Sequence, residues 1–374
     1  MNLSSEAREM YPSDFNSLLH HLRTDQLRRT GPENGVMISV GCSDRIYFDW
    51  VHENLGVPAK HIALEFYREK PAGLPAAVEW IPNTAGDMGD VENECADLMF
   101  AGQVVEHLWP EELAAFFFEA ARVLKAGGRL VVDSPNEEIV RATGWHHPEH
   151  TIEFRPVDAR TLLDLAGFRV TKIVGHWLCR SREGDILPLV DLRVEGPWPI
   201  ERRVNEGLDH PGDCFSWWIE GHKERPPNPA AVMRFVGDLW KRYGDRRIQC
   251  SVLSSAPEQT FVDGVRVGIA PLGWEGWLLF GPYAPLPPGR TLIGFTLDPY
   301  VATESPGRIE IFRAENNQIL AEAMLPPVKW NRDQVWLEVN LPATTFGLEF
   351  RLWTTGAAQL TARVGIDLAR IAQF

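Results

Sequence analysis

The chain has 374 residues, more than one ordinary domain contains, so two domains are expected. Its formal net charge of -14 argues against a nucleic-acid partner, because binding to phosphates needs clusters of Lys and Arg. The five cysteines are scattered without a C-x-x-C pair, so neither a disulfide framework nor a structural zinc site is predicted. No apolar stretch approaches the roughly 20 residues that span a bilayer, and the first residues lack the apolar core of a secretion signal. We expect a cytoplasmic protein with no membrane span.

Four segments of different character follow one another along the chain. Residues 1–30 carry apolar residues at helical spacing and are expected to form a helical lead-in. In residues 31–180, short β-branched runs alternate with amphipathic stretches, which predicts a parallel sheet with helices on both faces. Residues 181–247 contain Pro-rich turns and one amphipathic stretch, and we interpret them as a connector packed on the first domain. Residues 248–374 alternate in short runs between turns, which is typical of an antiparallel β-sandwich of jelly-roll-like form.

The expected elements can be given in chain order. Helices are predicted at 110–124, where Pro110 suits the first turn and Gly127-Gly128 ends the helix, and at 156–166 and 230–243. Fourteen tryptophans are many for a core, so some are expected to form aromatic contact surfaces. Strands of the first domain are predicted at 36–40, 62–64, 96–100, 129–133 and 168–174, and strands of the second domain at 277–280, 291–297, 308–313, 335–341, 347–353 and 362–368.

Residues 36–133 carry four landmarks in a fixed order. The first strand meets a turn at Gly41, and the second ends on the acid Glu65. Gly86-Asp87-Met88 comes next, and the fourth strand then leads into Ala101-Gly102-Gln103 and on to Glu106-His107. In this order the segment resembles the class I S-adenosylmethionine-dependent methyltransferases of type 11. The resemblance implies a Rossmann-like, doubly wound α/β sheet, S-adenosyl-L-methionine as the cofactor, and a methyltransferase activity.

The predicted donor site lies outside the carboxyl ends of the strands, where open α/β sheets bind ligands. Gly41 lets the backbone approach the ligand, and Glu65 is placed to accept both ribose hydroxyls. The resemblance further implies that Asp87 and Met88 flank the adenine and that residues 101–103 line the methionine moiety. The candidate cofactor-binding residues are Gly41, Ser43, Asp44, Glu65, Asp87, Met88, Ala101, Gly102 and Gln103.

The turn after the first strand departs from the family pattern. Ser39 stands where the family usually has an acid, and Ser43-Asp44-Arg45 replaces the glycine-rich remainder. Ser43 and Asp44 are good caps for the next helix, whose free N–H groups can receive a carboxylate. Asp44 is also a candidate to hold the donor's ammonium in place of the missing acid.

Three histidines are the candidate catalytic residues: His107, His147 and His150. His107 follows the fourth strand, and the other two lie in Trp145-His146-His147-Pro148-Glu149-His150, after the fifth strand. A near-neutral pKa suits imidazole to remove a proton from an acceptor hydroxyl. The same side chains can instead ligate a divalent metal or brace the loop. We predict no metal, and we favour His150 slightly over His147 as the base.

The second domain resembles carbohydrate-binding modules appended to bacterial glycan-modifying enzymes, through residues 276–283 and Leu348-Glu349-Phe350-Arg351. The resulting hypothesis is O-methylation of a sugar hydroxyl in a bacterial surface glycan or its precursor. One alternative is a small-molecule methyltransferase whose sandwich serves dimerisation, since sandwich edges often pair into a homodimer. Another is a non-catalytic glycan-binding adaptor with a degenerate donor site. The expected partner is therefore a glycan or a small-molecule acceptor.

Overall fold

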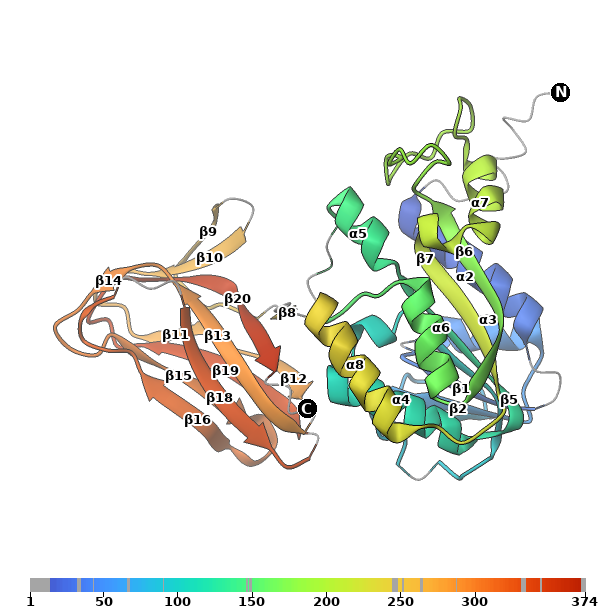
Figure 1. The fold of residues 1–374 in the computed structure, drawn as a ribbon. Helices are drawn as coiled ribbons and strands as arrows, with labels where there is room; N and C mark the ends of the chain where they lie inside the picture. The colour runs from blue at the N-terminus through green and yellow to red at the C-terminus, as the bar shows by residue number, and fades with distance from the viewer. Residues whose placement is uncertain are drawn as a thin grey trace. The chain divides into compact units, whose positions relative to one another are not determined.

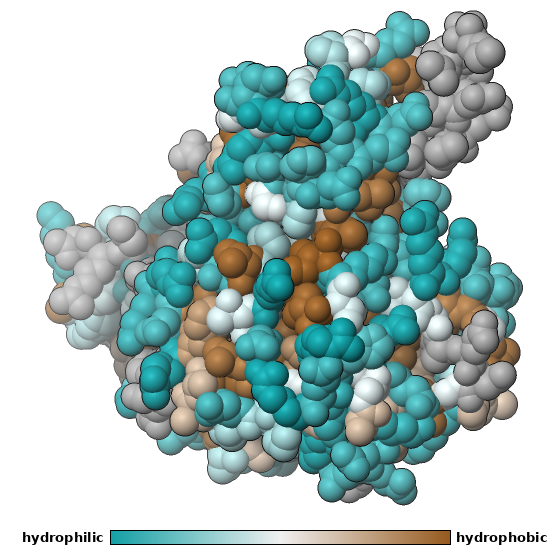
Figure 2. All heavy atoms as spheres, turned by 45° about the vertical axis from the view of Figure 1, so that its right-hand side comes forward, coloured by the Kyte–Doolittle hydropathy of each residue, from teal (hydrophilic) through white to brown (hydrophobic). Residues whose placement is uncertain are grey.

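The computed structural model describes residues 14–31, 35–42, 44–65, 68–89, 91–145, 147, 150–243, 248–250, 252–262, 265–286, 288–330, 334–343 and 345–370. The chain divides into two compact units, residues 1–245 and 246–373. In the part of the chain that is described, every helix is too short or too polar to cross a bilayer. Figure 2 shows a face on which hydrophilic residues surround a smaller area where apolar residues reach the surface.

The first unit is built on a seven-stranded sheet with the strand order β3-β2-β1-β4-β5-β7-β6. All neighbouring strands from β3 to β5 are parallel, whereas β7 is antiparallel to both β5 and β6. The strands are β1 (Val36–Val40), β2 (Lys60–Leu64), β3 (Val78–Ile81), β4 (Ala96–Gly102), β5 (Leu124–Pro135), β6 (Phe168–Leu178) and β7 (Cys214–Lys223). The predicted α/β class with a doubly wound sheet is confirmed.

Helices cover both faces of this sheet (Figure 1). Helices α4, α6 and α8 pack against one face of the sheet, where their apolar side chains form a large core. Helices α2 and α3 pack against the other face. Burial on two faces explains why β1 reads as a nearly continuous apolar run. The helices are α2 (Phe15–Thr30), α3 (Arg45–Leu55), α4 (Pro110–Val123), α5 (Glu137–Thr143), α6 (Pro156–Leu165), α7 (Ile200–Asp209) and α8 (Pro229–Tyr243), with short 3-10 turns η1 (Val105–His107) and η2 (Pro211–Asp213).

The segment predicted to be a connector contributes a central strand. β7 inserts between β5 and β6, and its residues from Cys214 to Gly221 are buried. Trp217 and Trp218 are fully buried in the core, so these two of the fourteen tryptophans form no exposed contact surface. The polar residue Glu220 interrupts the apolar pattern, but its buried carboxylate accepts hydrogen bonds from Trp218 and Lys172. Pairing of this kind removes the cost of burying a charged group in a strand.

The helical lead-in is confirmed for its described part. Asp14 caps α2 by accepting a hydrogen bond from the backbone N–H of Ser17, and Leu18, Leu22 and Leu27 are buried. Residues 1–13 lie outside the described part of the chain. Helix α4 ends at Val123, and the glycines expected to terminate it lie within β5, where Gly127 has a positive φ of 76°.

The second unit consists of antiparallel sheets. One has the order β18-β13-β20-β10-β9, with β8 paired to β20, and another has the order β11-β19-β15-β16, with β12 paired to β19. Burial alternates along β18, where Leu337, Val339 and Leu341 are buried and Glu338 and Asn340 are exposed, as expected for a sheet with one face in a core. The predicted antiparallel fold is confirmed. The strands are β8 (Ile248–Cys250), β9 (Glu258–Val262), β10 (Val265–Ala270), β11 (Gly276–Leu279), β12 (Pro282–Leu286), β13 (Gly289–Leu297), β14 (Tyr300–Val301), β15 (Gly307–Arg313), β16 (Gln318–Met324), β17 (Lys329–Trp330), β18 (Gln334–Leu341), β19 (Thr345–Thr354) and β20 (Leu360–Arg370), with the 3-10 turn η3 (Ala314–Asn316).

Candidate functional site

The carboxyl ends of β1 and β4 meet at Gly41. The backbone of Gly41 has φ +70°, and its N–H donates to the carbonyl of Leu64 over 2.9 Å. A side chain at this position would lie 2.8 Å from Cγ2 of Val104, just beyond the end of β4. Both the conformation and the space therefore favour glycine at this turn.

The acid predicted to hold the ribose is fixed at the end of β2. The side chain of Glu65 is only 4% exposed, and its Oε1 accepts a hydrogen bond from the backbone N–H of Arg68 over 3.3 Å. Asp44 is exposed and caps α3 by accepting from the N–H of Tyr47 over 3.0 Å. Ser43 lies outside the described residues.

The residues predicted around the adenine differ in their accessibility. Asp87 is exposed, and its Oδ1 accepts from the N–H of Gly89 over 3.0 Å. Met88 is fully buried in the core, and its N–H donates to Glu119 over 3.0 Å. The side chain of Met88 therefore packs in the core. Ala101, predicted to line the methionine moiety, is also fully buried.

A turn with a strained backbone follows β4 and is hydrogen-bonded to the end of β5. Gln103 has a positive φ of 56°, which is uncommon for a residue other than glycine. Its N–H donates to the carbonyl of Asp133 over 3.0 Å, and its side-chain Nε2 donates to Oδ2 of the same residue over 2.8 Å. A side chain on Gly102 would lie 2.8 Å from Oδ1 of Asp133, so glycine is required there too.

Two residues that were not predicted from the sequence also lie at this edge of the sheet. Asp133 is fully buried at the carboxyl end of β5, and burial raises the pKa of its carboxyl. Arg23 of α2 reaches to within 3.7 Å of its Oδ2 and opposes that rise. No local signal marks this pair, because α2 and β5 are far apart in the sequence.

Ser39, which replaces the family's usual acid, belongs to a buried polar chain. Its hydroxyl contacts the hydroxyl of Tyr47 over 2.7 Å and Nε2 of His61 over 2.8 Å. Burial lowers the pKa of His61 to about 3. The serine therefore ties β1 to α3 and β2, and burial keeps His61 neutral.

A cavity of about 300 Å³ lies beside Gln103. Helix α2 forms one wall, and the loop after α5 and the start of β7 form others. All three candidate catalytic histidines line it, so the structure brings together residues from two distant segments. The lining residues are Phe15, Asn16, Leu19, Arg23, Gln103, His107, Trp145, His147, His150, Phe215 and Ser216.

The three histidines are in ring contact with one another. The rings of His147 and His150 are stacked with centroids 4.4 Å apart, and the ring of His107 stands perpendicular to that of His150 at 4.7 Å. Nδ1 of His150 lies 2.9 Å from Oε1 of the buried Glu153. A carboxylate in this position orients the imidazole and favours the tautomer that carries its proton on Nδ1.

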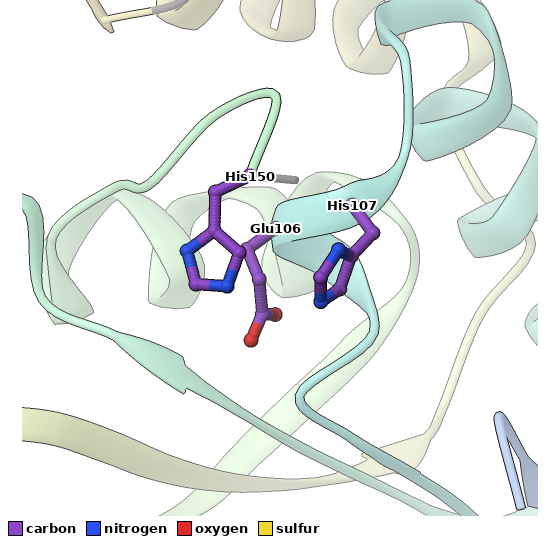
Figure 3. Close-up of side chains that lie close together, drawn as sticks. All are labelled: Glu106, His107 and His150. Atoms are coloured by element: carbon purple, nitrogen blue, oxygen red, sulfur yellow. The ribbon is translucent and has the colours of Figure 1, made fainter. Parts of the chain in front are cut away.

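The fully buried Glu106 lies next to the three histidines. Figure 3 shows its side chain between those of His107 and His150. Burial raises the pKa of Glu106 well above its ordinary value of 4.5, and the nearby Asp133 carboxylate adds to the rise. The sequence had marked Glu106 only as the neighbour of His107.

The central part of this unit matches a known family. A family model described as a methyltransferase domain matches residues 38–132. Those residues include the donor turn, Glu65, the turn at Gln103 and most of β5. This segment is a class I S-adenosylmethionine-dependent methyltransferase domain. Its family uses S-adenosylmethionine as the methyl donor, in agreement with the prediction.

The methyltransferase domain is also similar to individual proteins. A protein of Mycolicibacterium smegmatis, named as a probable S-adenosylmethionine-dependent methyltransferase, is 28% identical over 144 residues. The match covers 37% of this chain and 54% of the relative, so the chain spans about half the length of the curated relative it matches.

Solved structures with similar folds share less sequence. A methyltransferase from Archaeoglobus fulgidus is 19% identical, with a TM-score of 0.39, and the match covers 54% of this chain and 93% of the other. One from Aquifex aeolicus is 17% identical, with a TM-score of 0.38, and the match covers 59% and 98%.

The residues of the methyltransferase domain fit the donor. The open turn at Gly41 suits the approach of a carboxylate or an amine to the backbone. The buried carboxylate of Glu65 suits a diol, since a carboxylate has about four lone-pair positions that can accept hydrogen bonds. These two features stand at the ends of neighbouring strands, as a nucleoside ligand requires.

Proposed function

We propose that the chain is an S-adenosylmethionine-dependent O-methyltransferase whose acceptor is a sugar hydroxyl in a bacterial surface glycan or its precursor. The observation that carries the proposal is the cavity beside the turn at Gln103, because it is lined by three histidines. Gln103 lies in the turn after β4, which is predicted to line the methionine moiety of the donor, and it also lines the cavity. The donor site and the acceptor site would therefore adjoin at Gln103. An acceptor in the cavity is thereby held close to the donor's end of the sheet.

The chemistry that these residues would perform is alignment and proton removal. S-adenosylmethionine supplies a methyl group on a sulfonium, so a C–O bond forms as the C–S bond breaks and a neutral thioether leaves. The acceptor hydroxyl must approach in line, and its proton must pass to a base. Imidazoles at the cavity wall can receive it, and the contact with Glu153 orients the ring of His150.

The apolar wall that α2 gives the cavity also favours this function. Phe15 packs edge-on against Phe215 with ring centroids 5.3 Å apart, and Leu18 beside it is fully buried. Apolar side chains along this wall keep water from one side of the cavity, where electrostatic interactions are strengthened. Arg23 on the same helix supplies the positive charge that faces Asp133.

The second unit offers aromatic surface that suits sugars. Trp277 and Trp353 are half-buried and meet edge to face, with centroids 4.9 Å apart. The guanidinium of Arg351 lies 4.5 Å from the ring centre of Trp277, and Tyr283 is 52% exposed. Tryptophan rings stack on the apolar faces of pyranoses, and neighbouring Arg groups donate to sugar hydroxyls. This support is weaker than that of the cavity, since the same contacts also stabilise a sheet face.

The test is a methyl-transfer assay on a panel of acceptors. The purified chain is incubated with methyl-labelled S-adenosylmethionine and with nucleotide sugars, free oligosaccharides, small phenols and amines. Label on a sugar oxygen, located by NMR, is the expected result. Transfer to phenols or amines alone would refute the sugar assignment, and binding of glycans without any transfer would favour the adaptor.

Two variants make the assay specific. His150→Ala should reduce the rate by 10²-fold or more, which is the usual contribution of a positioned proton acceptor. His222→Ala is the matched control, because His222 contacts the carbonyl of Gly127 at the opposite end of β5. Equal rates for the two variants would contradict a role for the cavity histidines.

A further inference from the structure

The cluster of Glu106, His107 and His150 can do more than remove a proton. Each of the three side chains offers one possible ligand atom, and these three atoms lie within 4.8 Å of one another. Figure 3 shows that the three side chains converge, two from η1 and one from the loop before α6. Bonds to a first-row cation are about 2.0–2.2 Å long, so ligand atoms around it lie about 3–3.5 Å apart, and small side-chain rotations close the site.

The two segments that carry these side chains are fixed to each other. The backbone carbonyl of Glu106 accepts from the N–H of Thr151 over 2.8 Å and from its hydroxyl over 3.0 Å. The hydroxyl of Thr151 also donates to the carbonyl of Leu108 over 2.6 Å. His150 directly precedes Thr151, so the relative position of the three side chains is set by buried backbone contacts. A preformed geometry of this kind lowers the cost of binding an ion.

Glu106 is a buried acid that needs a partner when it is ionised. Neither carboxylate oxygen of the fully buried Glu106 has a hydrogen-bond partner within the described part of the chain. Arg23 approaches Asp133, the second buried acid of the region. A buried charge is costly unless it is paired or coordinates a metal. A bound cation would satisfy Glu106 in the same way that Arg23 satisfies Asp133.

Glu153 occupies the position of an outer-shell partner. It contacts Nδ1 of His150 over 2.9 Å, which directs the other ring nitrogen, Nε2, away from it. Histidines that ligate metals usually donate their second N–H to a carboxylate, which fixes the ring and raises its basicity. The arrangement of Glu153 and His150 reproduces this pattern.

We propose that Glu106, His107 and His150 form a binding site for one divalent first-row transition-metal ion at the wall of the cavity. Two imidazoles and one carboxylate suit Zn²⁺, Co²⁺ or Mn²⁺ better than Mg²⁺ or Ca²⁺, which prefer oxygen ligands. Since His107 and His150 line the cavity, the remaining coordination positions face the acceptor.

The use of this ion rests on the proposed function. A cation beside the acceptor lowers the pKa of a hydroxyl bound to it and fixes that hydroxyl's orientation. His147 stacks on His150 and would receive the acceptor's proton in place of His150, whose Nε2 would then bind the ion. The acceptor class then narrows to sugars that present a hydroxyl together with a second oxygen, since a vicinal pair can fill two coordination positions.

The experiment is a metal titration of the full chain in the absence of acceptor. The protein is stripped with chelator, and Zn²⁺ and Co²⁺ are titrated by calorimetry, with the visible spectrum of bound Co²⁺ as a second readout. One equivalent is expected for the wild type and for His222→Ala. Glu106→Gln and His150→Ala should each weaken binding at least tenfold. Glu153→Gln should weaken it by about 10-fold to 100-fold, the usual effect of losing an outer-shell partner.

Folding and donor binding are followed separately. Each variant is melted and titrated with S-adenosylhomocysteine, which should bind with unchanged affinity. Absence of metal binding by the wild type would overturn the proposal, and so would equal weakening in His222→Ala. If the metal binds but S-adenosylhomocysteine does not, the metal site stands and the proposed methyl transfer fails.

Discussion

Replacing Glu65 by alanine is the most direct test of the donor site. The carboxylate is 4% exposed, so water cannot readily replace the hydrogen bonds it would accept from two ribose hydroxyls. Each hydrogen bond to a charged group contributes about 1.5–3 kcal/mol. Allowing for partial compensation, the variant should lose about 3 kcal/mol, which raises Kd about 100-fold.

The measurement is calorimetric titration with S-adenosylhomocysteine, which carries the same ribose as the donor. Glu79→Ala is the matched control, because Glu79 lies on the neighbouring strand β3 with an exposed side chain paired to Lys60. It should bind the ligand like the wild type. A Kd for Glu65→Ala within twofold of the wild type, in a variant that melts normally, would refute the assignment of the ribose to this residue.

Three further predictions concern the same unit. In metal-free buffer, Glu106→Gln should become progressively more stable than the wild type as the pH rises above 4.5. The reason is that the pKa of Glu106 is raised in the folded state, so ionisation of this group opposes folding from that pH upward. Urea unfolding between pH 4 and 8 measures the difference in stability, and a difference that does not grow with pH would contradict the prediction. Gly41→Ala should cost about 1–2 kcal/mol for its left-handed backbone and weaken S-adenosylhomocysteine binding, since the new methyl group would lie 2.8 Å from Val104; unchanged affinity in a titration would show that the turn does not shape the donor site. Leu18→Ala removes a fully buried side chain of α2 and should cost about 2–5 kcal/mol; hydrogen exchange should speed up in α2, and unchanged protection there would mean that the helix is held by other contacts.

The sequence alone determined the fold class and indicated the edge of the sheet at which the candidate donor residues lie. Alternating apolar and amphipathic runs reflect strands buried on two faces and helices with one buried face, and these periodicities are local properties of the chain. The helix predicted at 110–124 is α4, with Pro110 at its start. Gly41 and Glu65 could be recognised because they directly follow strands, and the ends of parallel strands meet at one edge of the sheet.

Other features depended on tertiary packing. β7 was hidden because Ser216 and Glu220 break its apolar pattern, and its place between β5 and β6 depends on pairing with strands distant in sequence. The aromatic residues of that strand gave no sign of which side they would face, since tryptophan suits both cores and surfaces.

The polar groups of the cavity show the same limit. Arg23 and Asp133 are 110 positions apart and meet only because α2 packs over the end of β5. Glu106 reaches His150 through the contact of η1 with Thr151. The sequence specifies which side chains are available for chemistry, whereas the packing of distant elements decides which of them share a site, because contact between distant residues requires the whole fold to be formed.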